Sequence, residues 1–146
     1  MTVMRSDVVR AARSYIGTPF HHQGRSRVGM DCAGLVICVA RDLGIVPKDF
    51  DVPAYPRRAD GSTMIALCVE NMESIALDDM LPGDVIVVAV RRDPQHMGFV
   101  GDYRYGGFSI IHAASRRDGK GEVVETRLMF ARNQQYRAAF RIRVVQ

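Results

Sequence analysis

The 146-residue sequence contains no tryptophan, only three cysteines and no long run of apolar residues. A membrane-spanning helix needs roughly 18 consecutive apolar residues, so we expect no membrane span. Segment 1–7 lacks the apolar centre of a signal peptide. We therefore expect the chain to be made in the cytoplasm and to reach any extracellular site without a signal peptide. Three cysteines are an odd number without framework spacing, which argues against a disulfide scaffold.

Charge of both signs is present, with a basic excess. The formal net charge is +4, and arginine pairs stand at 57–58, 91–92 and 116–117. Such pairs can attract an anionic polymer, either nucleic acid or bacterial wall, or they can simply form a solvated surface. Because the sequence has no long basic run and no nucleic-acid-binding motif, we predict no nucleic-acid partner.

Length and apolar spacing predict one α+β domain over residues 1–146. A chain of this length buries a core, and its 47% hydrophobic and 25% charged residues are typical of a globular protein. The predicted helices are 7–16 with Ser6 as N-cap, 32–44 ended by Gly44, and 62–76 with Ser62 as N-cap. The predicted strands are 85–90, 96–102, 108–113, 122–127 and 138–145. This order indicates N-terminal helices packed on a C-terminal antiparallel sheet of about five strands.

Two connections have recognisable loop chemistry. Leu81-Pro82-Gly83-Asp84 places proline and glycine at the positions that a type II turn favours. Residues 47–61 contain three prolines and a glycine, and they predict a long loop of the kind that often carries function.

Cys32 stands at the predicted first turn of helix 32–44, directly after a basic, glycine-containing loop. Residues 33–40 carry no charge, which predicts a helix at the centre of the core. A helix N-terminus offers unpaired N–H groups and about half a positive charge, so it favours a thiolate, the form that attacks carbonyl groups. Cys32 is therefore a candidate nucleophile. Cys38 and Cys68 lie in apolar stretches and are predicted to be buried small hydrophobic residues.

His96 and His112 flank a predicted hairpin and can assist that cysteine. If the hairpin is centred on Arg104, the two histidines lie directly opposite each other, with Cβ atoms about 4.5–5.5 Å apart on one face. A cysteine nucleophile needs a base, and the base works best when a third group fixes its tautomer. Cys32, His96 and His112 can fill these roles in that order.

Five sequence blocks, in order and at matching spacing, resemble the NlpC-type cell-wall peptidases, a papain-like family of cysteine enzymes. The blocks extend over about residues 10–115 and are Gly17-Thr18-Pro19-Phe20 with Gly24, then 31–36, 81–85, 96–99 and 111–113. The resemblance implies a papain-like fold with Cys32 as nucleophile, His96 as general base and His112 as the polar third member. It also implies cleavage of amide bonds in peptidoglycan stem peptides, such as D-γ-glutamyl–diamino acid bonds, with no metal or organic cofactor. The backbone N–H of Cys32 is then a natural oxyanion donor.

The chain departs from the family at Phe20, where the resemblance implies a tyrosine whose hydroxyl lies close to the nucleophile. Phe20 cannot donate a hydrogen bond. His21 and His22 are therefore candidates for the oxyanion or substrate site together with Asp31, or the two histidines are loop residues without a chemical role. The segment Phe-His-His-Gln-Gly at residues 20–24 and the small size of the chain resemble most the bacteriophage branch of the family. That resemblance implies phage tail proteins as partners and action at the bacterial cell wall from the virion.

Three alternatives stay open at this stage. The chain can be a structural tail-assembly module that keeps the fold with little or no catalysis. It can bind a metal ion, because nitrogen and sulfur ligands suit zinc; the candidate ligands are His21, His22, Cys32, His96 and His112. It can also transfer an acyl group to an acceptor other than water.

Overall fold

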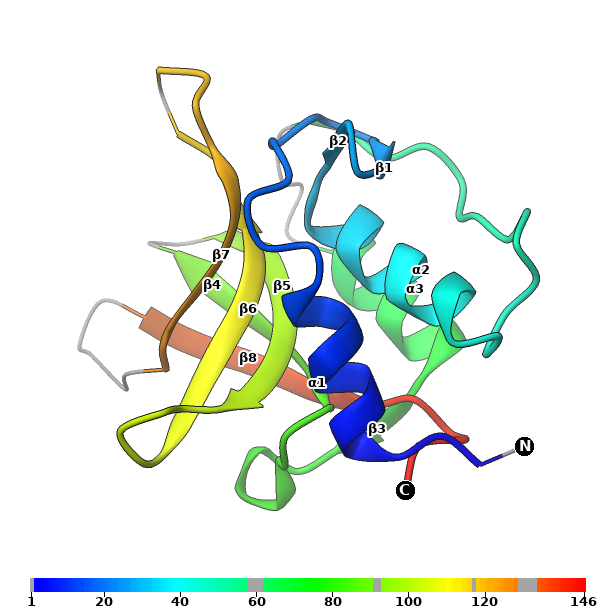
Figure 1. Ribbon diagram of the computed structural model, residues 1–146, viewed down its shortest axis with the longest axis vertical. Coiled ribbons are helices and arrows are strands. Elements are labelled where there is room, and N and C mark those ends of the chain that lie inside the picture. The colour runs from blue at the N-terminus through cyan, green and yellow to red at the C-terminus, as the bar shows by residue number, and fades with distance from the viewer. Residues whose placement is uncertain (1, 58–61, 91–92, 117, 129–133) are drawn as a thin grey trace.

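Helices cover one face of a twisted antiparallel sheet, and the main core lies between the two layers (Figure 1). The computed structural model describes residues 2–57, 62–90, 93–116, 118–128 and 134–146. The helices are α1 (Arg5–Arg13), α2 (Cys32–Asp42) and α3 (Thr63–Asn71), with a short 3-10 turn η1 (Leu77–Asp79). The strands are β1 (Arg25–Ser26), β2 (Gly29–Met30), β3 (Glu73–Ile75), β4 (Val85–Val90), β5 (Asp93–Asp102), β6 (Phe108–Ala114), β7 (Glu122–Arg127) and β8 (Gln134–Arg141). The α+β prediction is confirmed.

In the described part of the chain, the main sheet has six strands in the order β3-β8-β4-β5-β6-β7, and every neighbouring pair is antiparallel. Strand β8 returns from the end of the chain and lies between β3 and β4. A separate two-stranded ribbon, β1-β2, directly precedes α2. Within the described ranges, we find no helix that is long and apolar enough to cross a membrane.

Helix α2 lies at the centre of the core, as its uncharged sequence predicts. Leu35 and Val39 are completely buried, and the helix packs against α1, β5 and β6. Burying an aliphatic side chain of this size stabilises the fold by about 1.5–3 kcal/mol, so a helix buried on nearly every side is firmly held. Cys38 is also buried here, and Cys68 is buried on α3, as predicted. The residues at the start of α2 therefore sit on a rigid support.

Several predicted boundaries are wrong: α1 ends at Arg13 rather than 16, α2 ends at Asp42 rather than 44, and β5 begins at Asp93 rather than 96. Helix α1 begins at Arg5 rather than Asp7, because the Asp7 carboxylate accepts the N–H of Met4 at 3.1 Å and closes the first turn one step earlier; Ser6 lies inside that turn. The third helix ends at Asn71. The segment after it, predicted as helix to residue 76, instead pairs with β8 as strand β3, which makes the sheet six-stranded rather than five-stranded.

The last strand is also misplaced. It covers Gln134–Arg141 rather than 138–145, because residues 143–144 turn and Val145 bridges Val3 beside the chain's beginning. The predicted arginines at 58, 91, 92 and 117, and residues 58–61 of the predicted loop, lie outside the described residues.

The turns predicted at Gly83 and Gly44 are confirmed, because both glycines adopt a positive φ. Gly83 has a φ of +93°, and the N–H of Asp84 donates to the carbonyl of Leu81 at 3.0 Å, as in a type II turn. Gly44 has a φ of +67° and follows the last turn of α2. The turn also delivers Asp84 into the interior, where its completely buried carboxylate binds two arginines, Arg5 and Arg141.

Candidate active site

The start of α2 is built around the carboxylate of Asp31. Asp31 is the N-cap residue, and its side chain accepts the N–H of Gly34 at 2.8 Å. A β-carbon at Gly34 would collide with the carbonyl of Gly24, so the β1 segment packs directly against the helix start. Cys32 is consequently held in the first turn of α2, as predicted, with 8% of its surface exposed.

The protonation state of Cys32 differs from the sequence-based expectation. Burial raises the pKa of the Cys32 thiol to about 11, and the negative charge of Asp31 acts in the same direction. The backbone N–H of Met97 on β5 lowers the pKa, as do those of Ala33 and Cys32 at the helix start, but burial outweighs them. The resting residue is therefore a neutral thiol, and a base must accept its proton before or during attack.

His96 on β5 and His112 on β6 form a hydrogen-bonded pair through Nε2 of His96 and Nδ1 of His112. Their ring centroids are 4.5 Å apart, and the ring planes are nearly perpendicular at 86°. Burial lowers the pKa of His96 to about 3, with a further contribution from His112, and burial lowers the pKa of His112 to about 4. Both rings are thus neutral near pH 7. In the hydrogen bond between them, one of the two nitrogens, Nε2 of His96 or Nδ1 of His112, carries the hydrogen and donates it, and the other accepts.

The predicted hairpin register is wrong, although the predicted proximity is correct. Phe99 pairs with Ile111 and Asp102 with Phe108, so the hairpin is centred on Tyr105 rather than Arg104. Moving the centre by one residue moves each pairing partner by two, which keeps side chains on the same face. His96 and His112 are consequently diagonal neighbours rather than directly opposite.

Gly98 makes the diagonal contact possible. A β-carbon built there would lie 2.6 Å from the carbonyl oxygen of Ile111 and 2.9 Å from Cβ of His112. Because Gly98 carries no side chain, the backbone of β6 and the β-carbon of His112 approach β5 closely, and the two imidazole rings come into contact.

Cys32 contacts strand β5 at Met97, the residue after His96. The backbone N–H of Met97 acts on the Cys32 thiol, and α2 packs against both β5 and β6. The structure therefore brings the predicted nucleophile, base and third member to one region, where a helix start meets the middle of the sheet.

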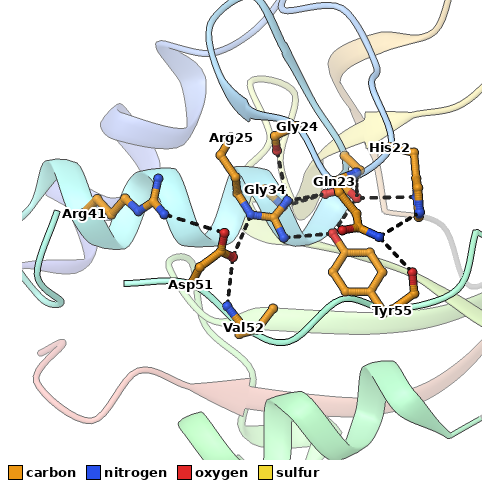
Figure 2. A network of polar contacts seen from close by, with 10 residues as sticks. His22, Gln23, Gly24, Arg25, Gly34, Arg41, Asp51, Val52 and Tyr55 are labelled. Atoms are coloured by element: carbon orange, nitrogen blue, oxygen red, sulfur yellow. Dashed lines mark hydrogen bonds and ion pairs between the residues drawn. The ribbon is translucent and has the colours of Figure 1, made fainter. Parts of the chain in front are cut away.

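Phe20, His21 and His22 take three different positions. Phe20 bridges Met30 and packs against the core. His21 is exposed. His22 lies beside the helix N-cap, with Nδ1 3.9 Å from the Asp31 carboxylate and its ring edge-on to Tyr55 (Figure 2).

Sequence reasoning missed Arg25 and Tyr55, which complete the surroundings of Asp31. Arg25 donates to the Asp31 carboxylate at 3.2 Å, and the Tyr55 hydroxyl donates to its other oxygen (Figure 2). Tyr55 lies 24 positions away in the predicted loop, and no local pattern connects a loop tyrosine to a distant helix cap. A metal site is not supported, because the His, Cys, Asp and Glu side chains of the described ranges form no cluster of three or more suited to holding an ion.

Comparisons with known proteins give one consistent result. The profile of the NlpC/P60 family matches residues 17–137. Proteins named as probable endopeptidases from Mycobacterium tuberculosis and Mycobacterium bovis are 30% identical over 99 residues, which cover 67% of this chain. The matched region is only 22% of the length of those relatives.

Solved structures share the fold. The NlpC/p60 domain of the peptidoglycan hydrolase SagA superposes with a TM-score of 0.61 at 21% identity and covers 94% of this chain and 98% of that one. An NlpC/P60 family protein from Bacillus cereus gives a TM-score of 0.68 at 19% identity, covering 97% of this chain and 41% of that one. NlpC2 from Trichomonas vaginalis gives 0.59 at 22% identity, covering 93% and 46%.

Proposed function

Because the chain belongs to the NlpC/P60 family, we propose that it is a cysteine peptidase that hydrolyses amide bonds in peptidoglycan stem peptides. Bonds such as D-γ-glutamyl–diamino acid are the expected targets. The observation that carries the proposal is the hydrogen-bonded pair of His96 and His112, together with the contact of Met97, the residue after His96, with Cys32 at the start of a buried helix. The names of the mycobacterial relatives and of SagA give independent support for a hydrolase.

The proposed reaction begins with two neutral partners. As the Cys32 sulfur attacks the amide carbon, its proton passes to the free ring nitrogen of the histidine pair, with His96 as the base. The negative charge that develops on the carbonyl oxygen is stabilised by the N–H of Cys32 at the helix start. His112 holds the base in one tautomer through their hydrogen bond.

The protonated base next returns the proton to the leaving amine, and the C–N bond breaks. This leaves an acyl group on the Cys32 sulfur. Water, deprotonated by the same imidazole, attacks the thioester and restores the thiol. Because the attacking group is a thiol and the base an imidazole, the sequence of steps needs no metal ion.

Digestion of purified muropeptides tests the proposal, with new free amines as the readout. The wild type and Cys38→Ala, which alters another buried cysteine of the same helix, are expected to release amine. Cys32→Ala should release none, and His96→Ala should lose about 10²–10⁴-fold in rate, the usual contribution of a general base. If the folded wild type releases no amine from any wall chemotype, the proposal is wrong.

We further propose a phage setting, in which the chain is associated with a virion tail and opens the wall locally. The support is the amino-acid sequence around Phe20, which resembles the bacteriophage branch of the family. Tail-tip genes beside its own gene, and its presence in purified virions, are the expected results. Its presence only in uninfected cells would contradict this setting.

A structural tail module is the second candidate, and Phe20 favours it. This side chain packs into the core and offers no hydrogen-bond donor to an oxyanion. Alkylation of Cys32 by iodoacetamide across pH separates the candidates when combined with the digestion assay. A folded protein that is alkylated at Cys32 as the pH rises but releases no amine in digestion would favour the structural module.

A further inference from the structure

Residues 47–57, here called the strap, cross the outside of α2 and are tied to it at several points (Figure 2). Arg41 on α2 donates to the carbonyl of Phe50 at 2.9 Å. The Gln23 side chain donates to the carbonyl of Tyr55 at 3.1 Å. The strap thereby presents the Tyr55 hydroxyl to the N-cap of α2.

The strap and the residues around it converge on the carboxylate of Asp31, a residue that is only 3% exposed and directly precedes Cys32. It accepts the N–H of Gln23 at 2.7 Å in addition to the N–H of Gly34 at the helix start. Tyr55 and Arg25 donate to its two oxygens. Both oxygens are therefore fully engaged by this chain, and the carboxylate's negative charge stands next to the thiol.

Arg25 connects the strap to the carboxylate. Its side chain is only 13% exposed, and its guanidinium binds Asp51 at 3.0 Å, Asp31 at 3.2 Å and the Tyr55 oxygen at 3.1 Å. The Tyr55 hydroxyl accepts a hydrogen bond from Arg25 and donates one to Asp31, and Arg25 also donates to Asp31, so the three side chains are mutually hydrogen-bonded. This contact places one positive charge against the negative charge beside Cys32.

We propose that Arg25 and Tyr55 are positioning residues for the reaction of Cys32: they lock the Asp31 carboxylate onto the start of α2, and Arg25 offsets its charge beside the thiol. The inference rests on the proposed function of Cys32 as the nucleophile. Among the described residues, Cys68 on α3 is buried, which raises its pKa, and the histidine pair on β5 and β6 is neutral, so neither brings a positive charge. The Arg25 guanidinium, 3.2 Å from the Asp31 carboxylate, does bring one.

The first test is the rate of Cys32 alkylation by iodoacetamide at pH 8, followed by mass spectrometry of the Cys32 peptide. At this pH the rate follows the thiolate fraction. Arg25→Gln leaves Asp31 uncompensated and is expected to slow alkylation by about tenfold, which corresponds to one pKa unit. The matched control is Arg27→Gln, which removes the same charge two residues away, where Arg27 contacts Ser14 and Tyr15 instead.

Arg25→Lys separates charge from geometry. A lysine restores the positive charge, so alkylation should return to within about threefold of the wild type, but one ammonium cannot reproduce the planar fork of hydrogen bonds. We expect kcat on muropeptides to stay about tenfold low in Arg25→Lys, with KM little changed.

The second test uses two tyrosines that bind carboxylates at opposite ends of α2. Tyr55→Phe removes the hydroxyl from Asp31 at the start of the helix, and Tyr15→Phe removes one from Asp42 at its end. We expect kcat to fall about tenfold in Tyr55→Phe and to stay within about twofold of the wild type in Tyr15→Phe. Equal thermal unfolding midpoints of the two variants would assign the difference to positioning rather than to stability.

Two failures are distinguishable. If Cys32→Ala still releases amine, the proposed function falls, and the inference falls with it. If Cys32→Ala is inactive while Arg25→Gln alkylates like Arg27→Gln and Tyr55→Phe turns over like Tyr15→Phe, only the positioning inference is overturned. Should Arg25→Gln fail to fold, Arg25→Lys and Tyr55→Phe decide the question in the same way.

Discussion

Gly98→Ala is the substitution that most directly tests how the histidine pair is held. The added methyl group would lie 2.6 Å from the Ile111 oxygen and 2.8 Å from Cγ1 of Ile110, where ordinary contacts begin at 3.4 Å. The shortfall toward Ile111 is about 0.8 Å, from 3.4 minus 2.6. The oxygen belongs to the backbone of β6, so it cannot rotate away, and β5 and β6 must separate by several tenths of an ångström.

The separation carries His112 with it, because its Cβ lies 2.9 Å from the same methyl position. Overpacking of this kind costs about 1–3 kcal/mol of unfolding free energy. The effect on catalysis is larger, since a misplacement approaching 1 Å costs on the order of 10²-fold in rate. We expect kcat/KM on muropeptides to fall by about 30-fold to 100-fold, while the variant remains folded at 25 °C.

Gly101→Ala is the matched control on the same strand. Its methyl group would meet the Ser109 hydroxyl and the end of Glu125, which are side-chain atoms away from the histidines. Urea unfolding and muropeptide digestion are measured for both variants. If Gly98→Ala loses stability like Gly101→Ala but keeps its activity within about twofold, the reasoning that close β5–β6 approach sets the His96–His112 geometry is refuted.

Three further predictions concern stability and chemistry. Burial opposes ionisation of Asp84, but hydrogen bonds from two arginines outweigh it and lower the pKa of Asp84. Asp84→Asn should therefore reduce the free energy of unfolding in urea by about 3 kcal/mol. Asp118→Asn, at an exposed ion pair, should leave that free energy without measurable change. Since the folded protein keeps His96 and His112 neutral and the unfolded chain binds protons below about pH 6.5, stability should fall as pH decreases from 6.5 toward 4. Equal unfolding free energies at pH 7 and pH 5 would contradict that pH prediction, and the drop should be smaller in His96→Gln. Treatment with EDTA should leave muropeptide digestion unchanged, because the proposed thiol and imidazole steps need no metal ion; loss of activity that added zinc restores would contradict this.

Local patterns predicted much of the site. The uncharged run after Cys32 was enough to place a buried helix there, and Gly83 and Gly44 marked their turns, because these features depend on neighbours within a few residues. The histidine pair was also predictable, since a hairpin brings residues of equal distance from its turn to one face. Its register was not, because the tight turn with positive φ at Gly106 and Gly107 shifts the centre by one residue.

What the sequence by itself determined is therefore the elements that carry the proposed reacting groups: Cys32 at a helix start, and His96 and His112 on adjacent strands. The tertiary structure decided the state of those groups. Burial by residues far apart in the chain, rather than the helix N-terminus alone, keeps the thiol protonated and the imidazoles neutral. It also decided that Tyr55 reaches Asp31 across 24 positions, because only the folded path of the strap brings these two side chains within hydrogen-bonding distance.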